Sequence, residues 1–284
     1  MTIFDTAVSM EFFYIFIGVV VSLTGVVTAR EEKMDQNAHG GDPEKTGTPW
    51  PFFAAAAVMS ALVAVNSVYY LKAWAADNNF LYGLGNIKYY EANKTAAPQA
   101  RLKILDLTLS HLDASMEQNP VESHYDVYYG LASNYYADVM KDLNPDAAKY
   151  QLNEGIKRLL ACKDVTWEPE DLYMTLAGAY TRLGGLDNAI RYSKVVVDDW
   201  DHQNFYTRYN LADILMKRAD KRSADGDAAG ARDDLREAGG ELKKGEAVIV
   251  GREDFAHVYG QMLELEKKIE KRLEKTGAGT APAP

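Results

Sequence analysis

Two long runs without a charged residue restrict most strongly what this chain can fold into. They cover residues 12–29 and 46–71. A helix needs about 20 apolar residues to cross the ~30 Å hydrocarbon layer of a bilayer, so both runs are long enough to do so. Trp50 and Tyr69 lie near the ends of the second run, where interfacial aromatic residues are expected. We predict transmembrane helices over about 11–30 and 50–72, joined by a polar loop at 30–49.

Small residues within these runs favour close packing of the two predicted helices. Pairs of small residues four positions apart let helix backbones approach each other in a membrane. The candidates for this packing are Gly18, Ser22, Gly25, Ala57 and Ala61. Residues 1–74 are therefore expected to form a membrane hairpin. Two buried helices of a soluble core, or a cleaved signal peptide over the first run, remain alternatives.

The orientation of the hairpin follows from its basic residues. The segment before the first run has no Lys or Arg, whereas the loop contains Arg30, Lys33 and Lys45. The positive-inside rule then places the loop in the cytoplasm and both termini outside, although Lys72 and Lys88 favour the opposite orientation. We expect a multi-pass protein of a bacterial inner membrane whose C-terminal part is periplasmic.

Beyond residue 72 the chain has a different character, because helical periodicity dominates and strand signals are nearly absent. Its clearest unit is 171–201. Leu176, Ala177 and Tyr180 share one face of a first helix, Gly184 ends that helix, and Ala189 lies where a second helix crosses it. This spacing resembles the tetratricopeptide repeat, whose signature has residues of these types at these positions.

Further copies of the unit are weaker. One begins at Leu131–Ala132 with Tyr135, another at Leu211–Ala212, and a fourth at Leu84. The resemblance implies an all-α protein, with two transmembrane helices followed by an antiparallel helix-pair solenoid over 75–275. The amphipathic helix near 253–275 is expected to cap the solenoid, because a terminal repeat needs a polar outer face. Residues 276–284 have the composition of a flexible tail. An unrelated helical bundle is the alternative.

Composition and motifs exclude several classes of function. The net charge of −10 argues against nucleic-acid binding, which needs a clustered basic face. One cysteine, Cys162, permits no intramolecular disulfide, and the five histidines follow no metal-ligand spacing. Phosphate-binding, dinucleotide-binding and nucleophile motifs are absent from the sequence. We therefore expect no catalytic residue, cofactor, metal or small-molecule substrate.

The resemblance to tetratricopeptide proteins also implies a binding surface. In that family, first-helix residues line a concave groove that receives partner peptides or helices. Its positions correspond here to Tyr129, Tyr136, Met174, Arg182, Tyr206, Tyr209 and Asp213. The chain has 18 tyrosines, and tyrosine suits an interface because its large ring carries a polar tip. The expected groove is aromatic and mildly acidic.

The function expected from these features is that of a non-catalytic, membrane-anchored scaffold or accessory subunit. Its partners would be the lipid bilayer and other protein subunits of a membrane complex, with respiratory or photosynthetic electron transport as the favoured setting. The alternative is a periplasmic biogenesis chaperone, either translocon-associated or similar to the cytochrome c maturation protein that presents apocytochrome for haem attachment. An enzyme with an unrecognised helical site is a third reading.

Overall fold

A computed structural model describes residues 50–200 and 205–278 of the chain, and all regular secondary structure in these ranges is helical. The expected all-α class is confirmed for this part. The first expected membrane span, the polar loop and residues 279–284 lie outside the described residues. Gly18, Ser22 and Gly25 therefore lie outside them too.

The first described helix, α2 (Trp50–Ala92), is 43 residues long. The chain divides into two units within this helix, after Ala75. In the described part of the first unit, Val58, Leu62 and Val65 are exposed, as are Ala57 and Ala61. No helix within residues 50–200 and 205–278 combines the length and the apolar character needed to cross a membrane. The span expected over 50–72 thus has no support in the described part of the chain.

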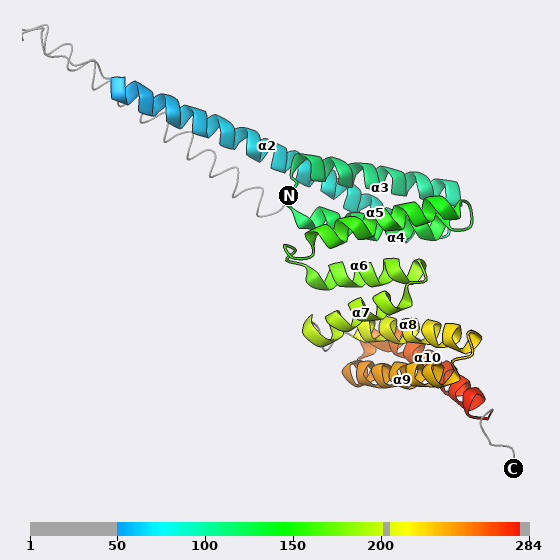
Figure 1. Cartoon of the computed structure of the whole chain (residues 1–284). Helices are drawn as coiled ribbons and strands as arrows, with labels where there is room; N and C mark the ends of the chain where they lie inside the picture. The colour runs from blue at the N-terminus through cyan, green and yellow to red at the C-terminus, as the bar shows by residue number, and fades with distance from the viewer. Residues whose placement is uncertain (1–49, 201–204, 279–284) are drawn as a thin grey trace, which may run out of the picture. The chain divides into compact units, whose positions relative to one another are not determined.

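The second unit, from Ala76 onward, contains the end of α2 and a series of antiparallel helices (Figure 1). The helices are α3 (Pro98–Gln118), α4 (Ser123–Met140), α5 (Pro145–Cys162), α6 (Pro169–Arg182), α7 (Leu186–Val195), α8 (Phe205–Ala224), α9 (Ala228–Ile249) and α10 (Ala256–Ala278). A π-helical turn, η2 (Val196–Trp200), extends α7, and a 3₁₀ turn, η3 (Glu253–Phe255), precedes α10.

These helices pack as consecutive pairs in a repeat-like arrangement, as Figure 1 shows for α4 with α5, α6 with α7, and α8 with α9. Neighbouring pairs meet through α4 and α6 and through α7 and α8, and α10 packs on α9. The pairing confirms the expected solenoid-like packing of helices.

Turn residues in the sequence set where one helix of a pair ends and the other begins. Gly184 has φ +75° and Gly226 has φ +87°, a left-handed conformation that favours glycine. They follow α6 and α8 respectively, so the predicted end of the helix at Gly184 is confirmed. Asn144 begins α5, because its side-chain oxygen accepts the N–H of Ala147 at 3.1 Å.

The crossing of α4 and α5 is a close helix contact inside a pair. A Cβ placed on Gly155 would lie 2.9 Å from the Cβ of Ser133 and 3.5 Å from the Cα of Gly130. Only glycine lets the two backbones approach this closely. The crossing therefore fixes which face of α4 turns toward α5 and leaves a different face for α6.

Candidate functional site

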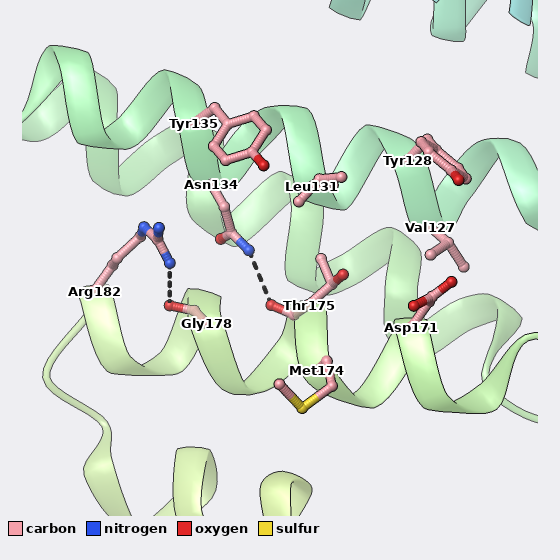
Figure 2. A pocket seen from close by; sticks show the side chains of 10 residues that line it. All are labelled: Val127, Tyr128, Leu131, Asn134, Tyr135, Asp171, Met174, Thr175, Gly178 and Arg182. Atoms are coloured by element: carbon pink, nitrogen blue, oxygen red, sulfur yellow. Dashed lines mark hydrogen bonds between the residues drawn. The ribbon is translucent and has the colours of Figure 1, made fainter. Parts of the chain in front are cut away.

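The candidate site is a pocket of about 310 Å³ between the first helices of two successive pairs, α4 and α6. Figure 2 shows the two helices facing each other across it. It is lined by Val127, Tyr128, Leu131, Asn134, Tyr135, Asp171, Met174, Thr175, Gly178 and Arg182. Lining residues three or four positions apart share one helix face, so the lining of each helix is a single stripe.

Asn134 is the central polar group of the pocket, and only 4% of its surface is exposed. Its Nδ2 donates a hydrogen bond to the carbonyl of Thr175 on α6 at 3.0 Å. Its Oδ1 is buried and has no hydrogen-bond partner. A buried acceptor left without a donor costs about 1–3 kcal/mol. The pocket wall thus contains an acceptor without a donor among the residues that the structure describes.

Gly178 and Arg182 form the end of the pocket near the C-terminus of α6. Arg182 donates from Nη1 to the Gly178 carbonyl at 2.9 Å. Its Nε and Nη2 donate to the two carboxylate oxygens of Asp138, at 2.9 and 2.6 Å. A Cβ on Gly178 would lie 3.1 Å from Arg182 Nη1 and 3.2 Å from Asn134 Nδ2. Glycine therefore keeps this end open, while Asp138 compensates the charge of Arg182.

The opposite end of the pocket is anionic. Asp171 lies in the first turn of α6, at the far end of the helix from Arg182 (Figure 2). It is exposed, and none of the ion pairs between the described residues includes it. Burial raises the pKa of Tyr128 nearby, and the negative charges of Glu168 and Asp171 add to the rise. The charge is therefore negative at the Asp171 end of the pocket and positive at the Arg182 end, where Asp138 compensates it.

The structure separates the groove residues expected in the copy at Leu131 from those expected in the unit at 171–201. Met174 and Arg182 line the α4–α6 pocket. Tyr129 is only 6% exposed and contributes to a different recess, of about 470 Å³, beside Asp113 and Gln151. Its hydroxyl accepts a hydrogen bond from Gln151 at 3.2 Å, and the Arg158 guanidinium lies 4.0 Å from its ring centre. Tyr129 therefore lies outside the α4–α6 pocket.

The other expected residues also lie outside this pocket. Tyr136 and Tyr209 are half-buried and pack against core clusters. Tyr206 is 51% exposed at the start of α8. Asp213 is paired with Lys217 at 2.7 Å. These four residues line neither of the two recesses described here.

Sequence reasoning missed the α4 side of the pocket, which is Val127, Tyr128, Leu131, Asn134 and Tyr135. The repeat register placed Tyr129 and Tyr136 toward the groove. In the structure, Gly130 and Ser133 face α5, which turns Leu131 and Asn134 toward α6. The signal available in the sequence was the pair of small residues, Gly130 and Gly155, that marks the α4–α5 crossing.

In the described part of the chain, no group of three or more His, Cys, Asp or Glu side chains is placed to hold a metal. His124 bonds Glu168 through Nδ1 at 2.5 Å and stacks on Trp167 with ring centres 5.5 Å apart. This pair links the start of α4 to the start of α6. The contact therefore helps to hold α4 and α6, the two helices that form the pocket, in place.

Comparison with known proteins gives no family assignment. No model of a known protein family matches the chain, and no curated protein matches it.

Proposed function

We propose that this chain is a non-catalytic scaffold subunit that holds another protein in the pocket between α4 and α6. The observation that carries the proposal is the buried, unpaired Oδ1 of Asn134 inside a preformed pocket. A pocket that leaves an acceptor unsatisfied is incomplete alone, because buried polar groups in proteins are almost always hydrogen-bonded. A bound segment of another protein supplies the missing donor.

The chemistry of the pocket walls suits a protein ligand. Leu131 and Met174 offer apolar surface, and Tyr128 and Tyr135 add rings with hydroxyl groups. Interfaces commonly combine an apolar centre with aromatic residues and a polar edge. The hydrogen bond from Asn134 to the Thr175 carbonyl also holds α4 and α6 together without a ligand. The site is therefore formed before binding, which lowers the entropic cost of association.

The proposal includes the tetratricopeptide-like character of the helix pairs and an N-terminal membrane anchor. The anchor is inferred from the charge-free runs at 12–29 and 46–71. Val58 and Val65 of α2 are exposed apolar residues, which fits a helix face that lipid covers in this proposal. In this proposal the helical unit is periplasmic, at a bacterial inner membrane. It belongs to a multi-subunit complex, with respiratory or photosynthetic electron transport as the favoured setting.

Native mass analysis after gentle detergent extraction tests the proposal. The wild-type chain is expected in a stoichiometric complex with another protein. Gly178→Leu fills the pocket and should release that protein, whereas Gly240→Leu is the matched control, because Gly240 has no atom within 4 Å of an added Cβ. Thermal unfolding of each variant checks that its fold is retained.

Two outcomes would contradict the scaffold function. Equal retention of the complex by both variants would place the interface elsewhere on the chain. Recovery of free protein, with transient binding of unfolded polypeptides only, would favour a biogenesis chaperone.

A further inference from the structure

We infer that the α4–α6 pocket selects a basic segment of its partner protein, with a Lys or Arg side chain beside Asp171 and an N–H group donated to Asn134 Oδ1. The inference rests on the proposed function and names the chemical class of partner that the same site takes.

Charge complementarity is the first argument. Asp171 is the pocket carboxylate without an ion-pair partner among the described residues, and it is exposed to an incoming group. The only cationic group of the lining, Arg182, is bound at two points by Asp138. An anionic ligand would have to compete with that two-point contact, whereas a cation meets an unpaired carboxylate. The pocket therefore favours a cation.

Hydrogen-bonding capacity is the second argument, and it is independent of charge. The Nδ2 of Asn134 is occupied by the Thr175 carbonyl, so only the acceptor Oδ1 remains. A ligand at this point must be a donor, which a carboxylate or a phosphate dianion is not. Peptide N–H groups and the nitrogen atoms of Lys and Arg side chains are donors. The acceptor at Asn134 thus selects a hydrogen-bond donor, and the peptide N–H groups and basic side chains of a protein segment meet this requirement.

The shape of the lining fits a long basic side chain. Leu131 of α4 and Met174 of α6 lie between Asp171 and Asn134 along the pocket (Figure 2). Lys and Arg side chains place their methylene stems along apolar surface while the charged group remains near water. The exposed position of Asp171 permits this arrangement, since the cation stays at the edge of the pocket.

Binding of peptide arrays to the purified full-length chain tests the inference. The arrays carry short extended peptides of the same apolar background in which one central position is Lys, Arg, Gln or Glu. Wild type is expected to prefer the Lys and Arg peptides. Asp171→Asn should weaken them by about two- to fivefold, the effect of an exposed ion pair. Asp171→Lys should remove the preference for basic peptides.

Two variants complete the test. Asp225→Lys makes the same change of charge at an exposed residue outside the pocket and should leave the preference unchanged. Asn134→Ala removes the acceptor and should weaken the Lys, Arg and Gln peptides alike, provided that its unfolding transition matches that of wild type. Raised ionic strength should weaken only the contribution of Asp171.

The results separate this inference from the proposed function. If Gln or Glu peptides bind as well as basic ones, and Gly178→Leu still abolishes their binding, the basic class is wrong while the pocket remains the binding site. If Gly178→Leu leaves all peptide binding unchanged, both the inference and the proposed site are wrong. Absence of binding by every peptide class would likewise contradict both.

Discussion

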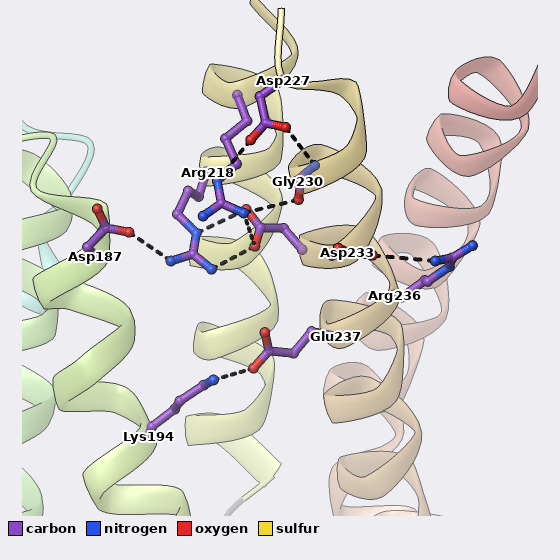
Figure 3. A network of polar contacts seen from close by, with 10 residues as sticks. Asp187, Lys194, Arg218, Asp227, Gly230, Asp233, Arg236 and Glu237 are labelled. Carbon is purple, nitrogen blue, oxygen red and sulfur yellow. Dashed lines mark hydrogen bonds and ion pairs between the residues drawn. The ribbon is translucent and has the colours of Figure 1, made fainter. Parts of the chain in front are cut away.

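Arg218 of α8 binds Asp234 of α9 at two points, with Nε 3.0 Å from Oδ2 and Nη2 2.6 Å from Oδ1. Asp234 is only 2% exposed. The same guanidinium reaches α7, where its Nη1 lies 2.7 Å from Asp187 Oδ1 (Figure 3). Arg222 adds a third donor to Asp234 at 3.1 Å. One buried carboxylate therefore fixes α8 against α9, and Arg218 extends the contact to α7.

Asp234→Asn is expected to lower the free energy of unfolding by about 2–3 kcal/mol, because it leaves two guanidinium groups without their buried counter-charge. Chemical denaturation of the purified chain measures the change. Asp233→Asn is the control, since Asp233 is exposed and pairs only loosely with Arg236 at 3.4 Å. It should change the free energy by less than about 0.5 kcal/mol. Equal effects of the two variants would contradict a structural role for the Asp234 pair.

Gly155→Ala is expected to destabilise the chain by about 1–3 kcal/mol, the cost of overpacking a close helix crossing. The added Cβ would lie 2.9 Å from the Cβ of Ser133, which is attached directly to the α4 backbone and cannot move aside. Gly240→Ala is the control, for which the opposite change in stability is expected. Its Cβ meets no atom within 4 Å, so the higher helix propensity of Ala should stabilise α9 by about 0.5–1 kcal/mol. A stabilising Gly155→Ala would show that α4 and α5 do not cross there.

Cys162 is expected to resist thiol reagents in the folded chain. It is buried, and burial raises the pKa of its thiol to about 11, with the negative charge of Asp126 adding to the rise. At pH 8 the thiolate population should be about 100-fold lower than in the unfolded chain. Alkylation followed by mass spectrometry, with and without denaturant, measures the difference. Equal rates in the two states would mean that the helices around Cys162 do not enclose it.

Asp126 is expected to make the stability of the chain depend on pH. Burial raises the pKa of its carboxyl from 3.8 to about 6, although the charge of Arg158 acts in the opposite direction. The folded state therefore binds this proton more tightly than the unfolded state. The contribution of Asp126 to stability is favourable at low pH and is lost as the pH rises from about 4 to 6.

Asp126→Asn should accordingly raise the midpoint of thermal unfolding at pH 7 and flatten its change between about pH 4 and 6. Asp225→Asn, at an exposed residue, is the control and should leave the pH profile unchanged. A variant at Asp126 with the wild-type profile would show that its carboxyl titrates like one in water.

Local sequence signals predicted the helix pairs well, because each depends on a few neighbouring residues. Gly184 ends α6, and the Leu176–Ala177 pair is buried where the repeat pattern expects it. The face that α4 turns toward α6 was harder to predict. It depends on the close approach of Gly130 to Leu159 and of Gly155 to Ser133, two contacts between helices.

The candidate site illustrates the same limit. Met174 and Arg182 were expected in a groove because the α6 unit follows the repeat pattern closely, and both line the pocket. Asn134 carried no such signal. Its importance comes from the Thr175 carbonyl that occupies its Nδ2 and from the burial that isolates its Oδ1. Both are properties of two helices placed together.

Site-specific photo-crosslinking in cells tests the central claim, that another protein occupies the α4–α6 pocket, most directly. A photoreactive residue replaces Met174 in the pocket or Tyr150, which is 67% exposed on α5 and lies outside the pocket. The account predicts one dominant crosslinked protein from position 174, lost when Gly178→Leu is added, and no such product from position 150. A product from position 150 alone, or one from position 174 that persists with Gly178→Leu, would contradict it.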